Sequence, residues 1–115
     1  MNFISETQDD IRIITVNLKR ATISHADEFR SVLNDDINKG WKKIVVDLNG
    51  CEFMDSVFFG SLVSGLKDIV KLEGEIKICS STSDARKMLE HTRANRVFSL
   101  YENREEAIKS FLENK

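Results

Sequence analysis

A serine at the expected start of a helix, Ser56, is the side chain best placed to do chemistry. Residues 56–71 carry a helical pattern of apolar side chains that ends at the Glu73-Gly74 turn. A serine hydroxyl at an N-cap accepts a hydrogen bond from a backbone N–H of the first turn. The same N–H groups, with the positive end of the helix dipole, also bind phosphate. Ser56 is therefore predicted to be the N-cap and is a candidate phosphoacceptor.

A phosphate on Ser56 would change the surface around it without opposing the helix. The group adds about −1.5 to −2 charges at pH 7. Beside Asp55, and at an apolar contact surface, this charge would repel a bound partner. The alternative is that Ser56 only caps the helix, as serine often does for structural reasons alone.

Helical spacing predicts which side chains of residues 56–71 face the core, taking 100° of rotation per residue. Phe58 is expected on the flank, so that Val57 and Phe58 form an exposed docking surface beside Ser56. Changing either to Glu should then weaken partner capture with little effect on melting. The alternative, that residues 49–54 fold over Phe58 and bury it, stays open. The predicted core face is Phe59, Leu62, Val63, Leu66 and Val70, and the opposite face is Val57, Ser61, Ser64, Asp68 and Lys71.

The strands that must position this helix follow from short apolar runs bounded by turn residues. The run at residues 43–48, KIVVDL, is typical of a central strand covered on both faces. The alternation at residues 11–18 predicts a half-buried strand that pairs with residues 2–7 in an opening hairpin. Further strands are expected at residues 75–79 and 97–100.

Three more helices are indicated by apolar spacing and capping residues. The first spans about residues 25–39, with Ser24 and Asp27 resembling a capping box. The next helix is marked by Ala85, Met88, Leu89 and Thr92. The last helix is marked by a cap at Asn103 and an apolar face of Ala107, Ile108, Phe111 and Leu112. The order ββαβαβαβα predicts an α/β fold, a mixed sheet with helices packed on it.

Composition indicates one globular domain over residues 1–115. The chain is 41% hydrophobic and 31% charged, with a formal net charge of −2 and interspersed signs. No basic stripe offers itself to nucleic acid or to anionic lipid. Because a signal peptide and an apolar run of membrane-spanning length are both absent, we expect a cytoplasmic protein with reduced, buried thiols at Cys51 and Cys79.

The sequence does not support an enzyme, a metal site or a bound cofactor. It contains no G-x-S-x-G elbow, no glycine-rich phosphate loop and no metal-spaced Cys/His set. The isolated His25 and His91 are expected to be surface or capping residues. The pairs Asp35-Asp36 and Arg86-Lys87 are expected to be solvated helix faces.

Residues 44–66, IVVDLNGCEFMDSVFFGSLVSGL, resemble the STAS family of bacterial anti-sigma-factor antagonists. The resemblance rests on the apolar-Asp-Ser step at Met54-Asp55-Ser56, and it implies that a partner kinase phosphorylates Ser56. It further implies capture, when unphosphorylated, of an anti-sigma factor that is a histidine-kinase-like ATPase, and resetting by a PP2C-type serine phosphatase. The implied partner-binding residues are Asp55, Ser56, Val57, Phe58 and Ser61.

The sequence departs from the family both directly after this step and in the segment before the first helix. Many antagonists continue with a small residue and Gly-Leu-Gly, whereas Val57 and Phe58 stand here and only Gly60 keeps its place. Thr22 lies where the family usually has an acidic residue, and no role is carried over to it.

Two other classes of protein stay open. A small STAS subunit of a transporter or other regulatory complex would use the same helix start only for docking, without phosphorylation. Neighbouring transporter genes would favour the subunit, and a neighbouring kinase or phosphatase gene the switch. A flavodoxin-like receiver would need a clustered acidic pocket, for which only Asp47 and Asp55 come near.

Overall fold

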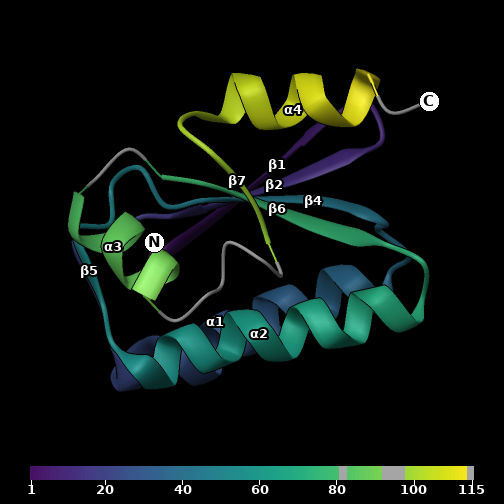
Figure 1. The fold of residues 1–115 in the computed structure, drawn as a ribbon. Coiled ribbons are helices and arrows are strands. Elements are labelled where there is room, and N and C mark those ends of the chain that lie inside the picture. Colours follow the sequence, from purple (N-terminus) through teal and green to yellow (C-terminus); the bar gives the residue numbers. More distant parts are fainter. Residues whose placement is uncertain (81–82, 92–97, 114–115) are drawn as a thin grey trace.

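Five strands form the central sheet of the computed structural model, which describes residues 1–80, 83–91 and 98–113 (Figure 1). The strand order is β1-β2-β4-β6-β7, in which β1 and β2 are antiparallel and the other neighbours are parallel. The mixed sheet predicted from the sequence is confirmed. The strands are β1 (Phe3–Gln8), β2 (Ile11–Val16), β4 (Lys43–Asp47), β6 (Glu75–Cys79) and β7 (Ser99–Tyr101).

Helices cover both faces of this sheet (Figure 1). Two long helices, α1 (Ile23–Asn38) and α2 (Ser56–Lys71), lie side by side on one face, and α4 (Arg104–Glu113) lies on the other. The short α3 (Ser83–His91) confirms the third predicted helix, although Thr92 lies outside the described residues. The predicted cap of α4 is also confirmed, because Asn103 Oδ1 accepts from the Glu106 N–H at 2.9 Å.

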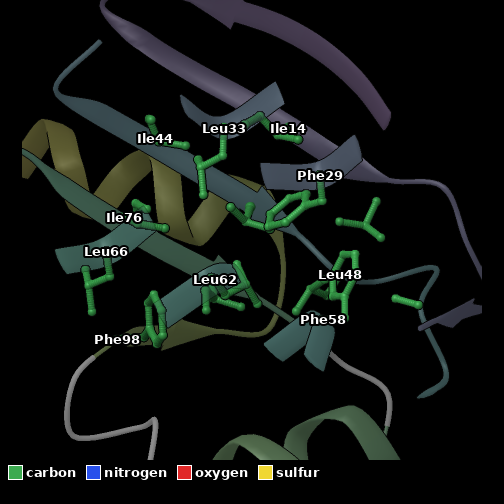
Figure 2. Packing of buried hydrophobic residues seen from close by; sticks show 14 of the residues in the cluster. Ile14, Phe29, Leu33, Ile44, Leu48, Phe58, Leu62, Leu66, Ile76 and Phe98 are labelled. Carbon is green, nitrogen blue, oxygen red and sulfur yellow. The ribbon is translucent and has the colours of Figure 1, made fainter. Parts of the chain in front are cut away.

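Alternation along the central strands divides the apolar core into two clusters, one on each face of the sheet. Ile44 and Val46 of β4 face α1 and α2, whereas Val45 between them faces α4. Figure 2 shows the first cluster, in which side chains from α1, α2 and the sheet meet. The second cluster consists of Ile11, Ile13, Val45, Cys79, Ala107, Ile108 and Phe111.

The buried face of α2 differs from the predicted one. Val70, predicted to be core, is 57% exposed, and Phe59 and Val63 are only partly buried. Part of the buried face packs against α1, which requires small residues: a Cβ on Gly65 would lie 2.1 Å from Leu33 Cδ2. Large apolar residues alone therefore gave the wrong helical phase. The buried residues of α2 are Phe58, Ser61, Leu62, Gly65, Leu66 and Ile69.

Two charged residues expected on solvated faces make internal contacts. Asp36 is buried, and its carboxylate accepts from Arg12 Nε at 3.2 Å. Arg86, half-buried, donates to the Ser80 carbonyl at 2.7 Å. For these two residues the expectation of a solvated face was wrong, because each has a partner outside its own helix that sequence spacing does not reveal.

Cys51 and Cys79 are free, buried thiols, as predicted. They lie in different apolar clusters, Cys51 in the one beneath α1 and α2 and Cys79 beneath α4. Burial is the main cause that raises the pKa of each thiol above its ordinary value. Both side chains therefore stay protonated at neutral pH.

Candidate functional site at two helix N-termini

A second, two-stranded sheet holds the starts of α1 and α2 next to each other. Its strands, β3 (Arg20–Ala21) and β5 (Phe53–Met54), pair in parallel and lead into the two helices. The ladder continues where the Asp55 N–H donates to the Ala21 carbonyl at 3.0 Å. Sequence analysis missed both strands, because two residues are too few to show an alternating pattern.

The carboxylate of Asp55 joins the two helix starts. Its Oδ1 accepts from the Phe58 N–H at 2.8 Å, and its Oδ2 accepts from the Ile23 N–H at 2.7 Å. Asp55 is thus the N-cap of α2 and also satisfies the first N–H of α1. The prediction that Ser56 is the N-cap was wrong by one residue, because aspartate caps a helix as well as serine does.

Ser56 is the first helical residue of α2, and its side chain is exposed. The Ser56 hydroxyl makes no hydrogen bond to any residue that the structure describes. Ser56 lies in the first turn, at the positive end of the helix dipole. Because Asp55 is the N-cap, the Ser56 hydroxyl is not needed for capping. A phosphoryl group on this oxygen would point into solvent beside the Asp55 carboxylate, which already occupies the Phe58 N–H.

The structure separates the other residues predicted to bind a partner. Val57 is 43% exposed, as expected. Phe58 is fully buried, with its ring centroid 4.8 Å from that of Phe29 and 6.2 Å from that of Phe3. Ser61 is buried too, with its Oγ 3.4 Å from the Val57 carbonyl oxygen. The prediction of exposed positions was wrong for Phe58 and Ser61, since both lie on the core side of α2.

Ile23 and Phe53 are exposed apolar residues that sequence analysis did not assign to the site. Ile23, in the first turn of α1, is 66% exposed, and Phe53 of β5 lies under the guanidinium of Arg20 at 4.4 Å. The sequence feature that could have indicated Ile23 is the position of the N-cap of α1. We call Ile23, Phe53, Ser56 and Val57 the helix-start surface.

The cap of α1 is Thr22 and not the Ser24-Asp27 pair predicted as a capping box. His25 Nδ1 accepts from the Thr22 N–H at 3.3 Å, so His25 takes the capping role expected for it. The helix therefore begins two residues earlier than predicted, which places Ile23 in its first turn. Placing the cap at Thr22 would have identified Ile23 from sequence.

The two aspartates considered for a receiver-like acidic pocket serve different structures. Asp47 lies on the α4 face of the sheet, where its Oδ2 accepts from Arg104 Nε at 2.9 Å. Asp55 caps α1 and α2 on the opposite face. Among the described residues, no group of three or more His, Cys, Asp or Glu side chains could hold a metal ion. The geometry therefore does not support the receiver interpretation.

The double role of Asp55 leads to a stability prediction. Asp55→Ala removes hydrogen-bond acceptors from two helix starts. We expect it to lower the free energy of unfolding by about 2 kcal/mol or more, compared with ~1 kcal/mol for the loss of a single cap. Asp55→Asn keeps one carbonyl acceptor and should lose less. Urea unfolding followed by circular dichroism measures both changes. An Asp55→Ala variant that is as stable as the parent would contradict the bridging role.

The site and fold together define a class of protein: a mixed α/β domain in which paired helix starts present an exposed serine beside apolar side chains. The STAS domain family model matches residues 2–107. This chain belongs to the STAS family.

Its relatives include proteins named as anti-sigma factor antagonists. A Thermotoga maritima protein named "Putative anti-sigma factor antagonist" is 31% identical over 101 residues, covering 87% of this chain and 88% of the relative. A crystal structure of an antagonist with the same description from that organism has a TM-score of 0.88 at 29% identity, covering 94% and 92% of the two chains. The phosphorylated form of the Bacillus cell fate determinant SpoIIAA shares the fold, with a TM-score of 0.74 at 17% identity and coverage of 95% and 98%.

Among the helices of the described residues, none combines the length and the apolar character that crossing a membrane requires.

Proposed function

We propose that this protein is an anti-sigma-factor antagonist that works by partner switching. Unphosphorylated, it binds a kinase-type anti-sigma factor through the helix-start surface, and phosphorylation of Ser56 releases it. The observation that carries this proposal is the exposed Ser56 hydroxyl, which no cap requires, in the first turn of α2. The names of the relatives support the class of partner.

The chemistry of the surface explains why a phosphate would act as the switch. Ile23 and Val57 offer apolar area for burial against a partner, which favours association. A phosphoserine at position 56, next to Val57, would have to lose its hydration for the contact to form. The Asp55 carboxylate adds a negative charge beside it, so a partner would meet two adjacent anionic groups. Release follows because desolvation of these charges outweighs the apolar contact.

Phosphorylation should leave the fold intact. The modified oxygen is exposed, and the α2 dipole favours negative charge at this end by about 0.3–1 kcal/mol. Repulsion from Asp55 opposes that gain. The two effects are of similar size, so we expect the modified domain to melt close to the unmodified one, and the switch to act on binding.

The direct test is a phosphorylation assay with a histidine-kinase-like protein that copurifies with this chain from its own cells. With ATP, its γ-phosphoryl group should transfer to Ser56 Oγ, leaving ADP, and the mass of the chain should rise by one phosphoryl group. Tandem mass spectrometry should place the group at Ser56, and Ser56→Ala should not react. A PP2C-type phosphatase should reverse the change.

The alternative of a structural STAS subunit predicts a different outcome. Protein purified from its own cells, in growth and in stress, would then carry no phosphate on Ser56 and would copurify with transporter subunits. That pair of results would overturn the switch. Phosphate at Ser56 in the native protein, together with a kinase-type partner bound only by the unmodified form, would support it.

A further inference from the structure

An arginine extends the helix-start surface across the two-stranded sheet. Arg20 of β3 pairs in register with Phe53 of β5, and both side chains are exposed. The Arg20 guanidinium lies over the Phe53 ring, with its Cζ 4.4 Å from the ring centroid. The next pair in register, Ala21 and Met54, is buried, so this small sheet turns Arg20 and Phe53 outward together. Arg20 is therefore continuous with the helix-start surface, of which Phe53 is a part.

Arg20 differs from the other arginines of the described residues in what its guanidinium contacts. The others bind carboxylate or carbonyl oxygens, namely Arg12, Arg30, Arg86 and Arg104. The Arg20 guanidinium forms no salt bridge and no hydrogen bond with any residue that the structure describes, including the neighbouring Glu52. Cation–π attraction holds it on the ring but leaves its N–H donors without an acceptor in the protein. In the isolated domain these donors are hydrated, because the side chain is exposed.

A partner that buries this surface must replace the hydration of the guanidinium. An arginine side chain stays positively charged in proteins, and removing an unpaired charge from water opposes binding. A carboxylate compensates best, because its two oxygens accept two parallel N–H bonds from the guanidinium fork. The Phe53 ring already restricts the guanidinium, so less side-chain freedom is lost when such a pair forms. The surface therefore favours a partner with an acidic residue opposite Arg20.

We propose that Arg20 determines the specificity of the helix-start surface by binding a carboxylate, from Asp or Glu, on the anti-sigma factor. The inference rests on the proposed function and names the chemistry that the partner must present at the same site. Charge complementarity supports it. The Asp55 carboxylate is engaged by two backbone N–H groups, those of Ile23 and Phe58, whereas the Arg20 guanidinium has no oppositely charged partner among the described residues. The charge left to be matched across the interface is therefore positive.

Charge substitutions at Arg20 test the inference by calorimetry with the purified kinase-type protein that copurifies with this chain. Arg20→Glu should raise the Kd at least about tenfold, because two carboxylates would then face each other. Arg20→Gln removes only the charge, so it should weaken binding less and make the affinity less dependent on salt. Lys39→Glu is the matched control, because it changes the net charge equally at the other end of α1. Its Kd should stay within about twofold of that of the parent, and all three variants should melt like the parent.

A crosslink identifies the partner's group directly. Arg20→Lys keeps the positive charge and places an amine at position 20, where the parent has none. A carbodiimide joins a carboxylate to an amine in contact with it, and takes up the water lost in forming the amide. Tandem mass spectrometry of the complex should then find position 20 linked to an Asp or Glu of the partner. Lys19, present in parent and variant, is the internal control, and adding Ser56→Asp to the variant should abolish the link.

Failure of this inference is distinguishable from failure of the partner switch. If Ser56→Asp loses binding while Arg20→Glu binds like the parent, the switch stands and the role of Arg20 is overturned. Links formed only at Lys19 in the Arg20→Lys variant would overturn it too, because the partner's carboxylate would then lie elsewhere. If no kinase-type protein binds the unphosphorylated parent, the proposed function fails and this inference fails with it.

Discussion

Ser56→Asp is expected to lose binding to the anti-sigma factor by at least tenfold in Kd, while Ser56→Ala binds like the unphosphorylated parent. The exposed hydroxyl of Ser56 is not needed for capping, so its removal leaves the helix-start surface apolar and uncharged. An added carboxylate in the same place must be desolvated for the contact with Ile23 and Val57 to form. Isothermal titration calorimetry with the purified partner measures both affinities.

The same two variants should differ little in stability. Because Asp55 is the N-cap, Ser56→Ala should cost less stability than the ~0.5–2 kcal/mol typical of a lost cap. We expect its free energy of unfolding to lie within about 0.5 kcal/mol of that of the parent. In Ser56→Asp, attraction to the helix dipole and repulsion from Asp55 oppose each other. A large difference in binding at nearly equal stability is what a purely structural serine cannot produce.

Ser31→Asp is the matched control for this experiment. Ser31 is an exposed serine of α1, outside the helix-start surface, and the substitution adds the same charge to the protein. It should leave partner binding unchanged and so exclude an effect of net charge. Equal affinities of Ser56→Ala and Ser56→Asp would rule out a charge switch at Ser56, whatever the stability of either variant.

The strands of the central sheet and the order of the helices between them could be predicted because each depends on a local pattern. The run at residues 43–48 became β4, and the alternation at residues 11–18 became β2. Apolar composition, strand length and turn residues contain that information within a few residues. The fold class also followed, because a parallel strand pair requires a crossover, and helices separated the strands.

The phase of α2 could not be predicted from apolar residues alone. A hydrophobic wheel gives weight to Phe59, Val63 and Val70, but the helix turns its small residues Ser61 and Gly65 inward. For Gly65 the reason is the close approach of Leu33 on α1, a contact between residues far apart in sequence. The same rotation buries Phe58.

The candidate phosphoacceptor Ser56 was proposed from sequence, whereas the hydrogen bonds around it could not be predicted. The Asp-Ser step at a helix start identified Ser56, but the role of Asp55 depends on a hydrogen bond to Ile23, which is distant in sequence. That bond exists because the short pair of β3 and β5 aligns two chain segments. Local capping rules treat each helix alone, so they cannot assign one carboxylate to two helices.

Two adjacent residues of α2, Val57 and Phe58, should respond in opposite ways to the same substitution. Val57 is 43% exposed, so Val57→Glu places its charge in water near the positive end of the helix dipole. We expect the free energy of unfolding to change by less than about 0.5 kcal/mol and the Kd for the anti-sigma factor to rise about tenfold or more. Thermal melts and calorimetry measure the two quantities.

Phe58→Glu should instead unfold the domain. The ring of Phe58 stacks on that of Phe3 and packs at a tilt against that of Phe29. Loss of such a core aromatic costs about 3–5 kcal/mol before the charge is considered. An unpaired carboxylate in that cluster adds a desolvation penalty to a domain whose total stability is about 5–15 kcal/mol. Phe58→Leu keeps an apolar side chain there, so it should fold and still bind the partner. A Phe58→Glu variant that melts like the parent would show that α2 presents this residue to solvent, and the helical phase described above would be wrong.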